Sequence, residues 1–207
     1  MKRRNLMPRF RPSATSNSSG SQFGGFMEGQ IVEYVDRSDE FDWADIFVDV
    51  VFRVPVSQYP VNYSLKGTYD REDNGNIKSC SLLNRIYYVF DAIGFKGGPN
   101  VKGEWEDADG IIIPKIDDYL NENHLKDDAL NSETYPYHIY VYKEWIADKG
   151  KAYTRVCPKI VMNTTKGITD LKSYVAFLRQ KNILKEYTGE TVQEGNTPSS
   201  TNPSVPF

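Results

Sequence analysis

The stretch that decides the fold lies at residues 137–162 and reads YHIYVYKEWIADKGKAYTRVCPKIVM. Apolar and polar side chains alternate on both sides of residues 147–150, and such alternation is typical of β-strands that bury one face. The connecting residues Ala-Asp-Lys-Gly end in glycine, which tight hairpin loops favour. The segment therefore predicts a β-hairpin with strands at residues 137–146 and 151–162.

Alternation gives the two faces of this hairpin different chemistry. One face carries apolar side chains suited to a protein core: Ile139, Val141, Val156, Ile160 and Met162. The opposite face carries aromatic and basic side chains: His138, Tyr140, Tyr142, Lys151, Tyr153, Arg155 and Lys159. Near the turn stand Lys143, Trp145 and Lys149. A shift of the register by one residue would exchange the faces.

Rings interleaved with cations predict a surface for single-stranded nucleic acid. Bases stack on exposed rings, at roughly 1–3 kcal/mol each, while lysine and arginine contact the phosphates. The expected stacking residues are Tyr140, Tyr142, Tyr153 and Trp145, and the expected phosphate contacts are Lys143, Lys149, Lys151, Arg155 and Lys159. Tyrosines in strands also cover core edges, so Tyr140 and Tyr142 have that second interpretation. Phe47 and Arg53, on a neighbouring strand, either extend this surface or pack beneath a loop.

The charge of the chain is unevenly distributed, although its net charge is only -3. Residues 1–27 carry five basic side chains and no acidic one, whereas residues 28–136 carry 10 basic and 22 acidic ones. Residues 137–187 carry 10 basic and four acidic side chains, so the hairpin lies in a positively charged part of the sequence. Local positive charge attracts phosphates even when the total charge is negative.

Five short strands with inserted helices are expected in total. Before the hairpin, strands are expected at residues 29–35, 44–54 and 59–66. Helices are expected from a cap at Ser79 or Ser81 through Ile93, at residues 117–128, and at residues 169–187 after the hairpin. The first helix is predicted from apolar side chains that recur at helical spacing: Leu82, Leu83, Ile86, Val89, Phe90 and Ile93. The fold class is therefore mainly β with inserted helices (α+β), arranged as a small, partly open barrel or a curved sheet.

Both ends of the chain have compositions typical of disordered segments. We expect a flexible basic arm at residues 1–27, a folded domain at residues 28–187 and a disordered tail at residues 188–207. The arm would add salt-sensitive phosphate contacts. Its Arg-rich, Ser-rich and acid-free composition also fits an organellar transit peptide, although Pro8 and Pro12 disfavour the amphipathic helix of such peptides. No apolar run is long enough for a membrane span, and the expected location is the cytoplasm.

The chain resembles the phage-encoded single-stranded DNA-binding proteins of the oligonucleotide-binding (OB) fold. Three features carry the resemblance: the strands divided by the helix near residues 80–94, the aromatic-basic hairpin, and the end of the chain, Val205-Pro206-Phe207. The resemblance implies an OB-like five-stranded barrel that coats single-stranded DNA during replication, recombination or repair, in the host cytoplasm and without enzymatic activity. It also implies binding of replication or recombination proteins by Val205, Pro206 and Phe207. Ser and Thr stand where the bacterial family has an acidic run.

Two other functions remain open from the sequence. In a structural or assembly protein, for example of a virus particle, the aromatic face would be a protein interface and the chain would form a defined homo-oligomer. In a metal-dependent nuclease, the five acids of residues 36–45 would hold Mg²⁺, although this density is more typical of a solvated turn. No phosphate-binding loop, nucleophile motif or metal motif is present, so we expect no catalytic residue, cofactor or metal.

Overall fold

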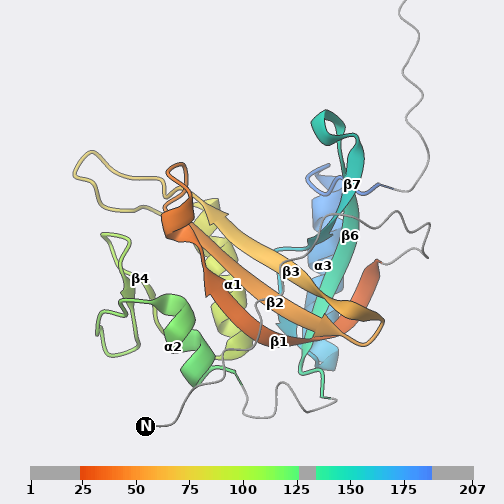
Figure 1. Ribbon diagram of the computed structural model, residues 1–207, viewed down its shortest axis with the longest axis horizontal. Helices are drawn as coiled ribbons and strands as arrows, with labels where there is room; N and C mark the ends of the chain where they lie inside the picture. The colour runs from red at the N-terminus through yellow and green to blue at the C-terminus, as the bar shows by residue number, and fades with distance from the viewer. Residues whose placement is uncertain (1–23, 126–133, 188–207) are drawn as a thin grey trace, which may run out of the picture.

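The computed structural model describes residues 24–125 and 134–187 (Figure 1). The predicted arm up to residue 23 and the predicted tail, with Val205, Pro206 and Phe207, lie outside the described residues. The elements are β1 (Gly25–Asp36), β2 (Ile46–Val54), β3 (Ser57–Gly67), α1 (Ser81–Ile93), β4 (Gly98–Pro99), β5 (Trp105–Glu106), α2 (Ile116–Asn123), β6 (Tyr137–Ile146), β7 (Lys151–Val156), β8 (Val161–Met162) and α3 (Thr165–Gln180). Two 3₁₀ turns lie at Ser38–Glu40 and Ala147–Lys149.

One antiparallel sheet organises the described residues, with the strand order β3-β2-β1-β6-β7 and β8 paired to the start of β6. Strand β1 pairs with β6 from Gly25 to Gly29 and with β2 from Gln30 to Asp36. A register irregularity between Ile31 and Glu33 marks a bulge, which bends a strand and increases its twist. The sheet consequently curls, with the β6–β7 hairpin rising steeply from the β1–β3 layer (Figure 1).

The curled sheet forms a half-barrel. Every neighbouring pair in the order is antiparallel, so β7 runs parallel to β3. These two end strands lie beside each other across the open side of the half-barrel. The mainly β fold with inserted helices is thus the one that the sequence predicted.

The main core fills the inside of the half-barrel. Val50 and Phe52 of β2 face inward, as their alternation predicted, and pack with Ile86 and Phe90 of α1 and with Ile139 of β6. All five side chains are buried. Helix α1 lies behind the β1–β3 layer in Figure 1 and covers its inner face. The helical spacing seen in the sequence therefore identifies the packed face of α1.

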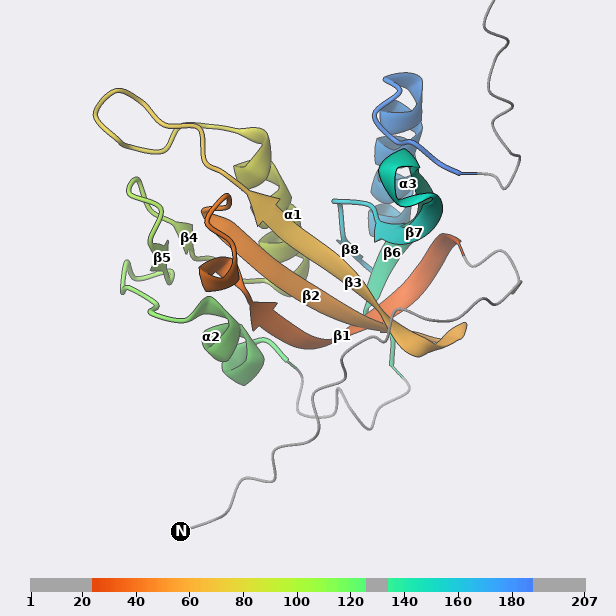
Figure 2. The same cartoon turned by 45° about the horizontal axis from the view of Figure 1, so that its top comes forward.

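A second, smaller core lies on the other side of β6, beneath α3 (Figure 2). Leu171, Val175 and Leu178 of the helix pack against Tyr140 of β6 and Cys157. Helix α3 begins after Thr164, whose hydroxyl accepts a hydrogen bond from the backbone N–H of Gly167. Such an N-cap supplies a partner for one of the free N–H groups of the first turn. One face of the hairpin is therefore covered by a helix.

Several element boundaries differ from the sequence prediction. Strand β1 begins at Gly25, within the predicted arm, because its first five residues pair with β6. Strand β7 ends at Val156 shortly before Pro158, which has no N–H for a continued ladder. Helix α3 ends at Gln180 rather than residue 187, and Asn182 has a φ of 53°, a left-handed conformation that no helix can continue. In both described ranges, no helix is long and apolar enough to cross a membrane.

The second core gives a direct stability prediction. Leu171 lies on the buried face of α3, so Leu171→Ala removes apolar contacts and leaves a cavity. We expect the free energy of unfolding, measured by urea denaturation, to fall by about 2–5 kcal/mol. Phe177→Ala on the exposed side of the same helix is the control and should change it little. Equal stability of the two variants would contradict the packing of α3 against β6.

Candidate nucleic-acid interface

The register of the β6–β7 hairpin sorts the predicted binding residues onto two opposite faces. The first, called here the Trp145 face, carries the cross-strand pairs Lys143–Thr154 and Trp145–Ala152. The second, called the Tyr153 face, carries the pairs Tyr142–Arg155, Glu144–Tyr153 and Ile146–Lys151. Alternation along each strand requires this division. Trp145 and Tyr153 therefore belong to different surfaces.

The Trp145 face presents an exposed aromatic ring beside a lysine. Trp145 is 43% exposed, and the ring of Tyr187 stacks against it at 5.2 Å between centroids and 30° between planes. The Lys143 ammonium donates a hydrogen bond to the Thr154 hydroxyl at 2.7 Å. Lys149 lies in the adjoining turn, on an exposed position. This face offers stacking surface and positive charge together.

The Tyr153 face places two cations over one ring. The Lys151 ammonium lies 5.0 Å and the Arg155 guanidinium 5.6 Å from the centroid of Tyr153. Arg155 also donates a hydrogen bond through Nε to the Glu144 carboxylate at 2.8 Å. Glu144 offsets the charge of Arg155, and both Lys151 and Arg155 lie over the Tyr153 ring. This face therefore has less free positive charge than the sequence suggested.

Tyr140 is not open for stacking, because α3 covers it. Its side chain is only 5% exposed and its ring lies 4.6 Å from that of Phe26. Its hydroxyl donates a hydrogen bond to the Glu186 carboxylate and accepts one from Arg179 at 2.6 Å. Burial, together with the bond to Glu186, raises the pKa of Tyr140 to about 12. The prediction of a stacking role for Tyr140 is therefore corrected: it covers the core edge, the second interpretation of the sequence.

Tyr142 lies beside Tyr140 and is partly buried by the same cluster. The two rings are nearly parallel, with centroids 6.3 Å apart and planes 15° apart. Burial and the nearby Glu144 carboxylate raise the pKa of Tyr142 to about 12. Tyr142 therefore belongs mainly to the packing under α3, and only part of its surface remains open.

The predicted phosphate contact Lys159 lies away from the hairpin turn. It follows Pro158, after β7 has ended, and its ammonium lies 5.6 Å from the centroids of both Tyr88 of α1 and Tyr174 of α3. Those two rings contact each other edge to face. Lys159 thus packs between two helices and does not share the surface of Lys151 and Arg155.

Phe47 and Arg53 lie on the outer face of β2, opposite the face that packs into the main core. Phe47 is buried because Phe41 stacks on it at 4.4 Å and Trp43 packs against its edge. Phe47 therefore packs beneath a loop and does not extend the predicted binding surface. Arg53 donates a hydrogen bond to the side chain of Gln30, and its guanidinium lies 5.9 Å from the ring of Tyr135.

Two acids of residues 36–45 pair with different arginines. The Arg37 guanidinium pairs with Glu40 at 2.8 Å, and Arg71 pairs with Asp45 at 3.2 Å. Over the ranges that the structure describes, no group of three or more His, Cys, Asp or Glu side chains is arranged to hold a metal ion. This geometry does not support the nuclease alternative.

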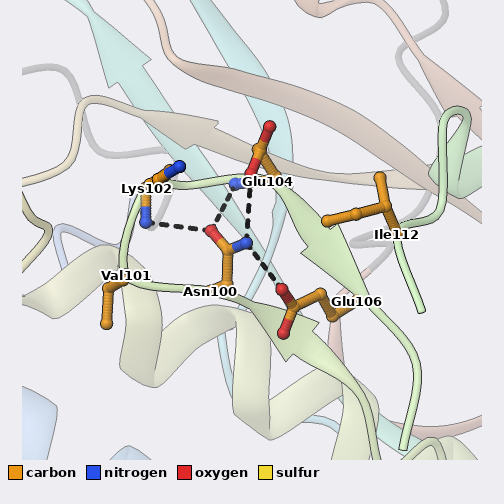
Figure 3. Close-up of a pocket in the computed structure, with 6 residues that line it drawn as sticks. All are labelled: Asn100, Val101, Lys102, Glu104, Glu106 and Ile112. Atoms are coloured by element: carbon orange, nitrogen blue, oxygen red, sulfur yellow. Dashed lines mark hydrogen bonds between the residues drawn. The ribbon is translucent and has the colours of Figure 1, made fainter. Parts of the chain in front are cut away.

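A hollow of about 560 Å³ lies over the β4–β5 segment, far in sequence from the hairpin (Figure 3). Its lining residues are Asn100, Val101, Lys102, Glu104, Glu106 and Ile112. The side-chain amide of Asn100 donates to the Glu106 carboxylate at 2.7 Å, and its oxygen accepts the Lys102 backbone N–H. These bonds stabilise the loop itself, and the two carboxylates make the hollow unfavourable for a phosphate.

Sequence reasoning missed three residues that pack around the hairpin: Arg179, Glu186 and Tyr187. The sequence placed them in one helix over residues 169–187, whereas the chain leaves the helix after Gln180 and returns to β6. No spacing or motif relates Tyr187 to Trp145, because their contact depends on this return. The two rings are partners only in the folded chain.

No protein-family model, curated protein or solved structure matches this chain.

The bonds between Arg179 and Glu186 predict a pH dependence of stability. They lower the pKa of Glu186, so their contribution is present above the unfolded-state pKa, about 4.3, and is lost as the pH falls through the folded-state value. Glu186→Gln should therefore lower the unfolding free energy by roughly 1 kcal/mol at pH 7 and have little effect near pH 2. Chemical denaturation at both pH values measures this difference. Glu122→Gln, on exposed α2 surface, is the control; a loss for Glu186→Gln that is independent of pH would contradict the ionic contribution.

Proposed function

We propose that this protein binds single-stranded DNA with little sequence preference, using the β6–β7 hairpin. The observation that carries the proposal is the Trp145 ring, which remains 43% exposed at the projecting end of the hairpin although Tyr187 stacks on it. Lys143 lies on the same face of β6, two residues before Trp145, and Lys149 lies in the turn that follows this strand. Every base offers a flat face to such a ring and every nucleotide offers a phosphate to a lysine, so this chemistry tolerates any sequence.

The fold supports an OB-like interpretation. Its order β3-β2-β1-β6-β7, with α1 inserted after β3, is compatible with a five-stranded, partly open barrel. In this interpretation β6 and β7 are the fourth and fifth strands of the barrel. The loop between those strands is one of the loops by which OB folds bind oligonucleotides, and here it carries Lys149 and adjoins Trp145.

The role that fits this binding is the coating of unwound DNA in replication, recombination or repair, as in the phage-type single-stranded DNA-binding proteins that the sequence resembles. The positive charge of residues 137–187 would concentrate DNA at the hairpin, while the acidic residues 28–136 would disfavour phosphates elsewhere. Partner binding by the end of the chain and a cytoplasmic location remain predictions from the resemblance.

The central role of Trp145 predicts a large effect of its removal. Trp145→Ala should raise the Kd for a short oligodeoxythymidylate roughly 5- to 150-fold, the range that corresponds to one stacked base. Fluorescence anisotropy with a labelled oligonucleotide at low salt measures this. Trp43→Ala is the matched control, because Trp43 is 54% exposed but lies in the acidic loop, and it should leave the Kd unchanged. Absence of wild-type binding at low salt, or a larger loss for Trp43→Ala, would overturn the proposal.

The basic arm predicts a change in salt dependence. Deleting residues 2–23 removes five cations, and each cation that contacts a phosphate of single-stranded DNA contributes about 0.7 to the slope of log K against log salt. The slope should therefore become less steep by up to about 3.5. Titrations at four salt concentrations measure it, and deletion of residues 188–207, which carry no basic side chain, is the control. An unchanged slope would show that the arm does not contact DNA.

A further inference from the structure

The chain after α3 folds back onto the edge of β6. Asn182, with its φ of 53°, reverses the direction of the chain, and Leu184 is buried in the core beneath α3. Three residues later the backbone N–H of Tyr187 donates to the carbonyl oxygen of Lys143 at 2.8 Å. The last described residues are thus fixed to the same strand that carries Trp145.

Tyr187 meets the edge of β6 at a place that β1 does not reach. The pairing of β1 with β6 ends at Val141, opposite Gly25, so the edge of β6 beyond that point has no partner from β1. Tyr187 meets this edge at Lys143. The side chain of Glu186 reaches the α3 side of β6 while that of Tyr187 reaches the Trp145 face, which is the alternation of an extended strand.

A three-residue latch holds this segment. The Glu186 carboxylate accepts hydrogen bonds from Arg179 at 2.7 and 2.9 Å, through Nε and Nη2, and a further one from the Tyr140 hydroxyl. A two-pronged guanidinium–carboxylate pair fixes orientation as well as distance. The latch therefore determines where the neighbouring Tyr187 ring lies.

Tyr187 supports one side of the Trp145 ring and leaves other surface of the ring open. The planes are 30° apart at a centroid distance of 5.2 Å, yet 43% of Trp145 remains exposed. A ring that is already held in place loses less conformational freedom when a base stacks on it. Lys185, exposed next to the latch, adds a cation on the returning segment.

We propose that Tyr187 is a second aromatic residue of the DNA site and that a base stacks on the open side of Trp145, continuing a Tyr187–Trp145–base column. This inference rests on the proposed function. In this arrangement the returning segment has a positioning role. The latch fixes the position of Tyr187, and the Tyr187 ring fixes the orientation of the Trp145 ring. The opposite arrangement, in which Tyr187 occupies the position of a base and must leave, predicts tighter binding when Tyr187 is removed.

The test compares Tyr187→Ala, Tyr187→Phe and Trp145→Ala by anisotropy with the same oligodeoxythymidylate. Tyr187→Ala should raise the Kd roughly five- to tenfold, whereas Tyr187→Phe should stay within about twofold because the ring and not the hydroxyl makes the stack. The double variant should bind no more weakly than Trp145→Ala alone, because Tyr187 acts through Trp145. Tyr59→Ala, an exposed tyrosine of β3, is the matched control and should have no effect.

Two results separate this inference from the proposed function. If the wild-type protein does not bind, the proposed function fails and this inference fails with it. If the wild type binds and Trp145→Ala weakens binding, but Tyr187→Ala binds as well as the wild type or more tightly, the inference alone is overturned. Urea denaturation of each variant establishes that the fold is intact.

Discussion

Strand β1 pairs with β6 through its first five residues and with β2 through the remainder, and the rest of the structure depends on this division. A bulge between Ile31 and Glu33, at the start of the part that pairs with β2, bends the sheet, so the β6–β7 hairpin rises from the β1–β3 layer instead of continuing it. Because β1 begins at Gly25, which pairs with Val141, the rest of β6 extends beyond this partner. That extension leaves Trp145 exposed and leaves an edge for Tyr187.

The two sides of β6 have different uses. Helix α3 covers one side, where Tyr140 joins a small core and completes the bonds of Arg179 and Glu186. The other side lines the interior of the half-barrel as far as Val141 and then, past the edge of the core, carries Lys143 and Trp145. One strand thus connects the packing of the C-terminal helix with the surface that we propose for DNA. A substitution at Arg179 or Glu186 should therefore alter the position of Tyr187 and, through it, the Trp145 ring.

Much of the architecture could be predicted from alternation and spacing, because these report which residues share a face. The inward set of β2, the helix α1 and the hairpin turn follow from such patterns. Alternation does not report which face a helix will cover, and Tyr140 suited either environment. The separation of Lys159 from the hairpin depends on Pro158, and the contact between Trp145 and Tyr187 joins residues brought together only by the return of the chain. Tertiary contacts of that kind leave no local pattern.

The claim that the Trp145 face of the hairpin binds single-stranded DNA is tested most directly by mapping where DNA touches the protein. An oligodeoxythymidylate carrying 5-iodouracil can be cross-linked by ultraviolet light to the intact chain, and the attached peptide can be identified by mass spectrometry. We predict that the cross-links fall on Trp145 or Tyr187 and decrease as the salt concentration rises. Cross-links confined to the acidic loop with Trp43, or none at low salt, would contradict the claim.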